Sequence, residues 1–287
     1  MIIISSSNAN QKDDLNITEI EVTASRLKQN PQELGSSYSV ITNEEIQNLG
    51  INFALDAISL TPGVTTNQNG PFGGVASVRI RGADSEQTLV LYDGIPINDP
   101  SSPGGGFDFS RIDVSEIEKI EILRGTHSTL WGSDAIGGVI SITSKQNENN
   151  ISRNFYSEVG SYNTLRAGAS VGRSNINNRF RIGFSQITSD GISKADKENG
   201  NLESDPYTSS MISGNGTINL AKDIKLSSSI RWSDTDAKFD NFGPVDGDLS
   251  TKTSELVGNL YLEAPIKKNI INYLSIGYSD IDRNNFT

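Results

Sequence analysis

The sequence contains no cysteine, one histidine and no long apolar run. The absence of cysteine excludes disulfide bonds and thiolate metal sites. His127 alone leaves little basis for a zinc site or a histidine-based catalytic triad. No segment approaches the ~18 apolar residues of a membrane-spanning helix, so a helical span is excluded. A transmembrane β-barrel stays open, because its strands place only every second side chain in lipid.

Positive charge is also scarce. The chain has 24 Lys and Arg against 35 Asp and Glu, a net charge of −11, and no basic stretch, which argues against nucleic acid as a partner. Residues 132–139 resemble a phosphate loop, but the Lys-Ser/Thr pair that reaches phosphate is missing. Neither a nucleophile elbow nor a pair of catalytic carboxylates is present. We therefore expect no enzyme and no catalytic cofactor.

The first 16 residues are polar and indicate either a disordered leader or a signal-peptide remnant. Small residues occupy the positions before a cleavage site, but the basic start and most of the apolar core are missing. Residues 17–24 (ITEIEVTA) then form an extended, proline-free segment before Pro31. Such a segment suits either an edge strand or a free peptide that adds to another sheet.

Regular signals begin at Tyr38 and indicate a mixed α/β domain. Glu44 and Glu45 follow a Thr42 or Asn43 cap, which predicts a short helix that ends at Gly50. A second helix is expected over residues 53–60, and strands are expected over residues 39–41, 77–81 and 88–92, and in the two β-rich runs between Ile117 and Lys145.

Two Gly- and Pro-rich loops, residues 67–74 and 98–106, interrupt this domain. They are too polar for a core and too long for simple turns, which favours binding loops over flexible surface. We expect ligand contacts from residues in both loops: Asn67, Gln68, Asn69, Gly70, Phe72, Asn98, Asp99, Ser101 and Ser102.

After Lys145 the hydrophobic period becomes two. One face is apolar and the other carries Arg, Lys, Ser and Gly, in strands of about nine to eleven residues, the length of a tilted membrane strand. Tight connections alternate with long ones, over residues 190–208 and 234–252. Short turns on one side and long loops on the other are typical of outer-membrane barrels, with the long loops outside.

The order of motifs resembles one family. The pieces TEIEVTAS, LDAISLTPGV, VRIRG, LVLYDGIPIN and IEKIEILRGTHSTLWGSDAIGGVISITSK, over residues 17–145, resemble the TonB box and plug domain of TonB-dependent outer-membrane receptors. Within the family, the short leader and spacing most resemble cobalamin (vitamin B12) transporters, although siderophore receptors share most of the plug motifs.

The resemblance implies a bacterial outer-membrane location with the plug in a barrel lumen and the TonB box in the periplasm. Loops outside capture a small ligand such as cobalamin. TonB, with its inner-membrane energising complex, then pairs with the released box and pulls on the plug. The implied TonB contacts are Thr18, Glu19, Ile20, Glu21, Val22, Thr23 and Ala24. Arg81 and Arg124, each followed by glycine, would lock the plug to acidic partners on the barrel wall; local turn capping is the equal alternative.

The two long connections are rich in aspartate. Calcium takes 6–8 oxygen ligands, and carboxylates from two adjacent loops suit it. Cobalamin transporters order their second and third outer loops with calcium, and loose alignment with them selects Asp190, Glu203, Asp205, Asp240 and Asp248. The spacing is not that of an EF-hand, and a solvated acidic surface is the other interpretation.

The expected fold is a mixed α/β plug domain followed by an incomplete antiparallel transmembrane β-barrel, with about seven strands of the family's ~22. Because open edges are not tolerated in lipid, the chain is interpreted as an N-terminal fragment. The domains are expected at 1–16 (leader), 17–30 (TonB box and linker), 31–147 (plug) and 148–287 (barrel). TonB-dependent uptake, most simply of cobalamin, is the expected function. An iron–siderophore receptor is the alternative within the class, and a passive porin or adhesin the alternative outside it.

Overall fold

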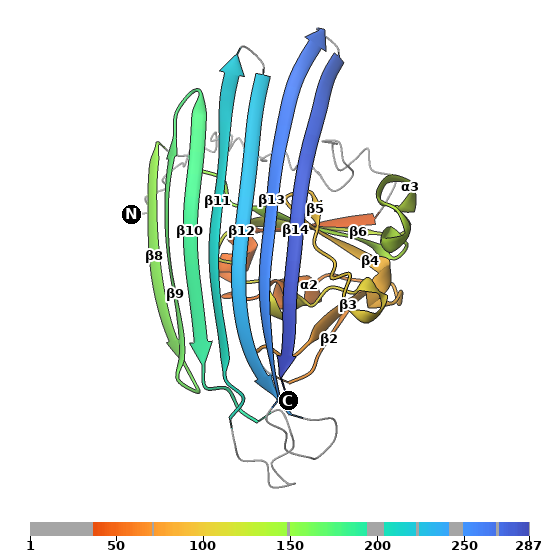
Figure 1. Cartoon of the computed structure of the whole chain (residues 1–287), viewed down its shortest axis with the longest axis vertical. Coiled ribbons are helices and arrows are strands. Elements are labelled where there is room, and N and C mark those ends of the chain that lie inside the picture. Colours follow the sequence, from red (N-terminus) through yellow and green to blue (C-terminus); the bar gives the residue numbers. More distant parts are fainter. Residues whose placement is uncertain are drawn as a thin grey trace, which may run out of the picture.

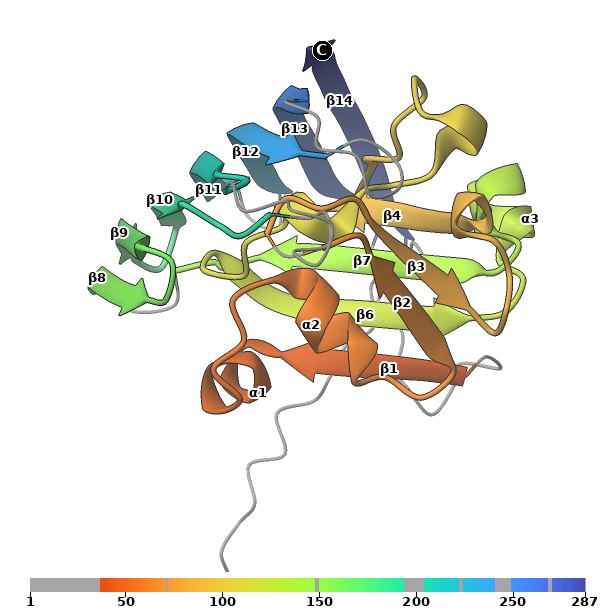
Figure 2. The ribbon, with the colours of Figure 1, turned by 90° about the horizontal axis from the view of Figure 1, so that it is seen from below.

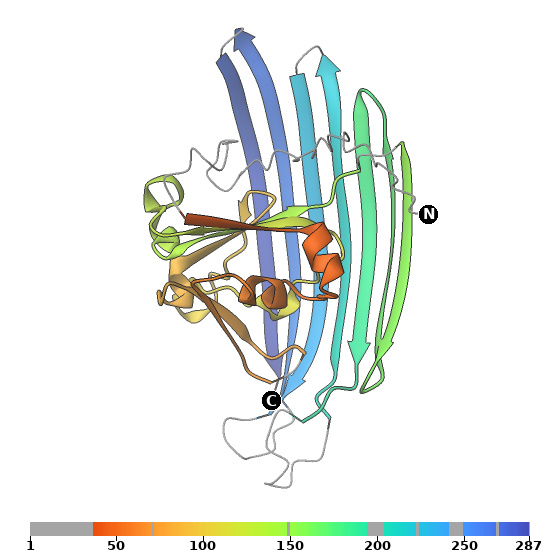
Figure 3. The same ribbon diagram turned by 180° about the vertical axis from the view of Figure 1, so that it is seen from behind.

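A computed structural model describes residues 37–70, 72–147, 150–193, 204–221, 224–240, 249–267 and 270–286. Its two parts are an N-terminal α/β domain, residues 37–147, and a C-terminal sheet of long strands (Figure 1). The domain lies along one side of the sheet, and its own strands run across the long strands (Figures 2 and 3). No helix in the described part of the chain is long and apolar enough to cross a membrane.

The N-terminal domain is built on a five-stranded sheet with the order β1-β6-β7-β4-β5. Strands β4 and β7 pair in parallel, and the other neighbours pair antiparallel. A separate hairpin joins β2 to β3. The strands are β1 (Ser37–Thr42), β2 (Val64–Gln68), β3 (Ala76–Ile80), β4 (Thr88–Tyr92), β5 (Ile95–Pro96), β6 (Ile117–Arg124) and β7 (Gly138–Ser144).

Three short helices complete the domain: α1 (Asn43–Asn48), α2 (Ala54–Ser59) and α3 (Ser128–Trp131). Single 3-10 turns lie at Ser85–Gln87, Pro103–Gly105, Phe109–Arg111 and Ser133–Ala135. Helix α1 confirms the predicted cap: Thr42 Oγ1 accepts from the Glu45 amide at 3.3 Å, and Glu45 Oε2 accepts from the Thr42 amide at 2.7 Å. This capping box fixes the point at which strand β1 turns into helix.

The C-terminal sheet has seven strands in sequence order, all antiparallel. They are β8 (Ile151–Gly160), β9 (Thr164–Ser174), β10 (Asn178–Ser189), β11 (Tyr207–Ala221), β12 (Ile224–Phe239), β13 (Leu249–Lys267) and β14 (Ile270–Phe286). The α/β domain followed by seven antiparallel strands confirms the expected fold. The expected strand length was too short, since β11 to β14 have 15 to 19 residues.

The two faces of this sheet are the reverse of those in a water-soluble protein. On β10, Arg181 and Ser185 are buried against the N-terminal domain, whereas Ile182 and Phe184 between them are exposed. Ile182 is 54% exposed and Ile230 on β12 is 56% exposed. A sheet with a polar covered face and an apolar bare face suits strands whose outer side contacts lipid.

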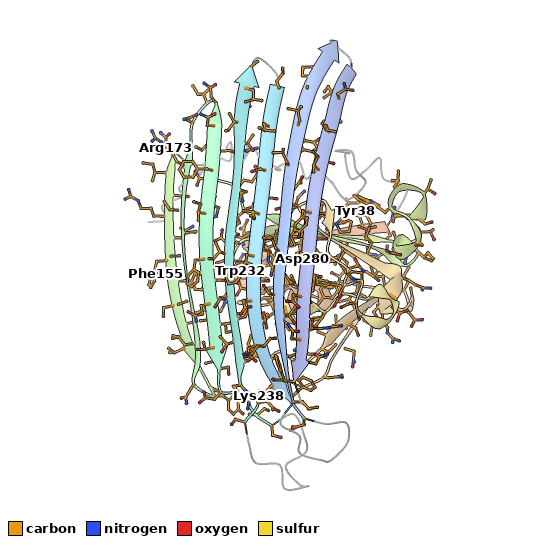
Figure 4. The ribbon with its side chains drawn as sticks, in the orientation of Figure 1. Tyr38, Phe155, Arg173, Trp232, Lys238 and Asp280 are labelled. Atoms are coloured by element: carbon orange, nitrogen blue, oxygen red, sulfur yellow. The ribbon has the colours of Figure 1, made fainter. Side chains whose placement is uncertain are left out.

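The register arranges the bare face in rows. One row runs across the sheet through Phe155, Ala169, Phe184, Ile212, Trp232, Leu256 and Asp280. Figure 4 shows Phe155, Trp232 and Asp280 at about the same height. The next row toward the long connections is polar: Ser157, Ala167, Gln186, Ser210, Asp234, Ser254 and Asp282. The apolar band therefore ends within one row.

The band continues in the other direction for three more rows, which include Ile182 and Ile230, then Phe180 and Leu260, then Ile218 and Leu262. Four rows extend over about 20 Å along the strands, since each residue rises ~3.4 Å. This is close to the ~25 Å apolar band of outer-membrane barrels.

Candidate functional site

The N-terminal domain meets the sheet through one short segment, residues 111–116, which we call the interface segment. It follows the Phe109–Arg111 turn and leads into β6. Backbone bonds hold it to the start of α2: the Ala54 amide donates to Ile112 O at 2.9 Å, and the Val114 amide donates to Asn52 O at 3.2 Å. All six residues are buried, although three of them, Arg111, Asp113 and Glu116, are charged. Buried charges require partners, and the sheet provides them.

Glu116 forms a two-point ion pair with Arg181 of β10. Arg181 Nε lies 2.6 Å from Glu116 Oε2, and Nη2 donates to Oε1 at 2.9 Å. A further bond joins Arg181 Nη2 to Ser170 Oγ at 2.7 Å. Gly183, on the same face of β10, leaves the space that the Glu116 carboxylate fills, because a Cβ there would lie 2.5 Å from Glu116 Cδ. Paired, doubly bonded geometry of this kind is the strong form of a charged hydrogen bond.

Asp113 pairs with Arg166 of β9, with Nε 3.0 Å from Oδ2. The same guanidinium donates to Asn52 Oδ1 at 2.9 Å and pairs with Glu158 of β8 at 3.0 Å. Its carbon lies 4.7 Å from the centroid of the Tyr156 ring, a cation–π distance. One arginine thus joins two strands of the sheet to two parts of the N-terminal domain.

Glu255 of β13 lies between two arginines. Arg111 Nη2 of the interface segment is 2.9 Å from Glu255 Oε1, and Arg231 Nη1 of β12 is 3.0 Å from Oε2. Arg231 also stands 5.4 Å above the Tyr92 ring. Asp108 Oδ2, 3.9 Å from Arg111 Nε, supplies a second negative charge. The group of four is therefore electrically neutral, as burial requires.

The β4–β5 turn makes a second contact with the sheet. Asp93 adopts φ 48° there, and Gly94 follows at φ 82°. Asn259 Nδ2 of β13 donates to Asp93 O at 2.8 Å. Burial raises the pKa of the Asp93 carboxyl, while hydrogen bonds from Ser144 and Ser229 act in the opposite direction. This turn therefore holds the end of strand β4 against β12 and β13.

The chain leaves the domain at Lys145, close to the interface segment. Lys145 Nζ donates to Ser115 O at 2.7 Å, and its carbonyl accepts from Asn215 Nδ2 of β11 at 2.6 Å. Burial lowers the pKa of Lys145, and the nearby Glu116 charge opposes that shift. The exit strand is thus fixed to both parts of the molecule.

The second predicted binding loop, residues 98–106, is occupied by internal bonds. Asn98 accepts from the Val90 amide and donates to Thr88 O and Gly105 O. Asp99 is buried, accepts from the Ser101 amide and hydroxyl, and pairs with Arg283 of β14 at 3.2 Å. Ser102 is half-buried, and its amide donates to Asp99 O. Asn98, Asp99 and Ser101 therefore have structural roles that the sequence did not indicate.

The first predicted loop divides into exposed and packed residues. Asn67 and Gln68 belong to strand β2, not to a loop, and they are exposed with Asn69 and Gly70. Phe72 instead packs between Phe53, 5.4 Å away between ring centroids, and Tyr207 of β11, 6.2 Å away. A pocket of about 150 Å³ lies beside it, lined by Phe53, Leu55, Asp56, Gln68, Phe72 and Ser110.

The N-terminal domain matches a known family. Residues 30–139 match the family model described as TonB-dependent Receptor Plug Domain. This part of the chain is a TonB-dependent receptor plug domain. The plug and the seven strands after it together confirm the resemblance expected from the motifs.

Two relatives in sequence are vitamin B12 transporters. The chain is 43% identical to the vitamin B12 transporter BtuB of Vibrio vulnificus strain YJ016 over 123 residues, which cover 43% of the chain and 20% of that protein. It is 32% identical to BtuB of V. vulnificus strain CMCP6 over 227 residues, 78% of the chain and 36% of that protein. The chain thus spans about a fifth to about a third of these relatives.

Solved structures with the same fold include siderophore receptors. FpvA of Pseudomonas aeruginosa, bound to heterologous pyoverdines, has a TM-score of 0.71 at 21% identity over 90% of the chain and 35% of its own. PirA of Acinetobacter baumannii has a TM-score of 0.69 at 23% identity over 91% and 41%. At such identities the likeness concerns the fold.

The two predicted locking arginines do not reach the seven-stranded sheet in any contact of the described residues. Arg124 donates to Ser37 Oγ, Ser39 Oγ, Tyr38 O and Pro62 O, all within the plug. Arg81 lies beside it at φ 53°, and burial and the Arg81 charge lower the pKa of Arg124. On this side of the plug, Arg124 holds the edge strand β1 to β6 through partners 62 to 87 residues away in the sequence, so its contacts are neither a lock to the sheet nor local turn capping.

In the ion pairs that hold the plug to the sheet, the positions of the acidic and basic partners are largely the reverse of those expected. Acids of the plug, Asp113, Glu116 and Asp99, meet arginines of the sheet, and among the ion pairs of the described residues only Arg111 follows the expected sense. These residues were not predicted from the sequence, although the pattern of residues along the strands contains a signal for them. Arg166, Arg181 and Arg231 each interrupt the small polar residues of an inward face, where an unpaired charge would be costly.

The predicted metal ligands are only partly described. Glu203 and Asp248 lie outside the described residues. Asp190 accepts from Asn163 Nδ2 at 2.6 Å, Asp205 is buried, and Asp240 accepts from Ser193 Oγ at 3.1 Å. Within the described ranges no three acidic or histidine side chains gather as a metal site would need. Asp234 and Asp236, expected in the long connection, lie instead in strand β12.

The predicted TonB contacts, residues 18–24, also lie outside the described residues. Strand β1 begins at Ser37, 13 positions after Ala24. The assignment of these residues remains a prediction.

Proposed function

We propose that the chain belongs to a receptor that takes up a scarce nutrient across the bacterial outer membrane with energy from TonB, and that it is not an enzyme. The observation that carries the proposal is that the two faces of the seven-stranded sheet have different surroundings. The inner face holds a plug domain by buried ion pairs, and the outer face carries a bare apolar band. A passive pore or an adhesin needs no plug fixed in this way.

The proposed ligand is cobalamin. The vitamin B12 transporter BtuB of V. vulnificus strain CMCP6 is a relative in sequence over 78% of the chain, and this supports cobalamin before other ligands. An iron–siderophore complex is the second candidate, because receptors for such ligands share the fold. The exposed residues Asn67, Gln68, Asn69 and Gly70 are the proposed plug contacts.

The Val22→Pro variant tests the proposal in cells that lack their own receptor and express the gene that encodes this chain. Proline removes a backbone donor and so disrupts an added strand. We expect uptake of labelled cobalamin to fall to the background of a TonB-deficient strain while binding to the cell surface is kept. A Val22→Thr control, which keeps a β-branched residue and the backbone amide, should transport normally.

Two results would contradict the proposal. Uptake unaffected by the proline would remove the TonB mechanism. Absence of cobalamin binding, with saturable binding of a ferric siderophore, would replace the ligand and leave the mechanism in place. Capture of a periplasmic TonB domain by a peptide of residues 10–35, lost on Val22→Pro, gives an independent measurement.

We further propose that calcium orders the two long connections through Asp190, Glu203, Asp205, Asp240 and Asp248. Oxygen ligands from adjacent segments suit this ion. Millimolar calcium is expected to slow proteolysis between residues 190 and 208 and between 240 and 248. Magnesium at the same concentration is the control, because its small octahedral shell fits such a site poorly. Equal cleavage rates with and without calcium would contradict the proposed calcium site.

A further inference from the structure

An aromatic cluster joins the plug to the sheet at the end that carries the long connections. It consists of Phe53, Phe72, Ile187, Tyr207 and Ala237. The first two belong to the plug, before α2 and between β2 and β3. The other three come from β10, β11 and β12, each within three residues of the strand end. The stems of both long connections therefore meet at one plug side chain, Phe72.

The fit at this point is close. Tyr207 is fully buried, and its ring lies 6.2 Å from the Phe72 ring and 6.4 Å from the Phe53 ring. Gly73 adopts φ +75°, and a Cβ there would lie 2.6 Å from the Tyr207 ring and 2.7 Å from Ala237 Cβ. Residues 72 and 73 thus need both an aromatic side chain and a bare backbone to fit against the sheet.

The remainder of the first apical loop has less support. The Asn69 amide donates to Val75 O at 3.1 Å within the hairpin, and residues 67 to 70 are exposed. Strands β2 and β3 form a sheet of their own, separate from the five-stranded sheet of the plug. The tip of this hairpin is therefore fixed to the sheet through Phe72 and Gly73.

We propose that Tyr207 is a positioning residue for ligand capture, because it seats Phe72 and Gly73 and so holds residues 67–70 at the mouth of the long connections. The part of this inference that concerns ligand capture rests on the proposed uptake function. The packing of Phe72 and Gly73 against Tyr207 does not depend on a ligand. Tyr207 is not proposed to contact the ligand itself. It fixes the loop of residues 67–70, which is proposed to contact the ligand, and it makes the position of this loop depend on the ends of β10, β11 and β12.

Hydrogen exchange of the complete protein in detergent tests the seating. We expect Tyr207→Ala to raise amide exchange over the hairpin tip, residues 67–73, roughly tenfold, since an aromatic contact and its packing are lost. Exchange in β6 and β7 should stay unchanged. Tyr207→Phe keeps the ring and should behave like the parent protein. Tyr273→Ala is the matched control, because Tyr273 stacks on Tyr261 elsewhere in the same sheet.

A second variant covers the case in which Tyr207→Ala fails to fold. Phe72→Ala removes the partner from the loop and leaves the sheet intact, and it should produce the same local rise in exchange. Unchanged exchange over residues 67–73 in either folded variant would overturn the proposal.

Ligand binding separates this proposal from the proposed function. Cobalamin binding to outer-membrane vesicles is expected to weaken roughly tenfold in Phe72→Ala and Tyr207→Ala and to be restored in Tyr207→Phe. If the parent protein binds neither cobalamin nor a ferric siderophore, the uptake proposal fails while the exchange result still decides the seating. If the variants loosen the loop but bind as the parent does, Tyr207 has no part in capture.

Discussion

The Glu255→Ala variant is expected to lose about 3–5 kcal/mol of stability, because it leaves two buried guanidinium groups without their shared carboxylate. Arg111 and Arg231 both lie within about 3 Å of that carboxylate, one from the plug and one from the sheet. Burial keeps water from replacing it. The change should therefore weaken the docking of the plug as well as the sheet itself.

The two tryptophans report on the two parts separately. Trp131 lies in α3 of the plug and Trp232 lies on the bare face of the sheet. Denaturant unfolding in detergent, followed in single-tryptophan variants, should show the Trp131 transition at lower denaturant in Glu255→Ala. Glu158→Ala is the control, since Glu158 is 49% exposed and its pair with Arg166 should contribute less than ~1 kcal/mol. Equal losses in the two variants would contradict the role given to burial.

The Ile230→Lys variant is expected to lose about 2–4 kcal/mol of stability in a phospholipid bilayer, the usual cost of lysine in the middle of a lipid-facing band. Ile230 lies inside the four apolar rows, one row from Trp232. The prediction rests on the proposed membrane location. Urea titration of the protein in vesicles, read by the gel shift of the folded form, measures the loss.

Gln186→Lys provides the matched control for this prediction. Gln186 is exposed on the same face, in the polar row that borders the band. Lysine there should change stability by less than ~1 kcal/mol, because its ammonium group reaches water. A similar loss in both variants would mean that the bare face does not contact lipid.

The local elements of this fold could be predicted because their causes are local. The capping box from Thr42 to Glu45 needs four residues, and the period of two in β9 to β12 appears in any window of the sequence. The change of the hydrophobic period to two after Lys145 is also local, so it marks the boundary between the α/β domain and the sheet of long strands. Such features depend on neighbours in sequence.

The ion pairs could not be predicted, because they depend on register between distant segments. Asp113 and Arg166 are 53 residues apart, and Glu116 and Arg181 are 65 apart. A shift of one residue in β10 would turn Arg181 to the outer face. The roles of Asn98 and Asp99 could not be predicted for another reason. A loop rich in Gly, Pro and Ser has the same composition whether its polar side chains contact a ligand or form hydrogen bonds with the backbone of the loop.

Two of the arginines that hold the plug, Arg166 and Arg181, lie on strands that follow the plug closely in the chain. Because only β8 lies between the plug and β9, and β10 comes next, the partners of both arginines on the interface segment are complete before these strands are synthesised. These two pairs span 53 and 65 residues, fewer than the 144 (255 − 111) between Arg111 and Glu255, so they close with a smaller loss of chain entropy. The plug is therefore placed to act as a template on which the first two hairpins assemble, and the charged segment that retains it also sets the starting point from which the wall is built.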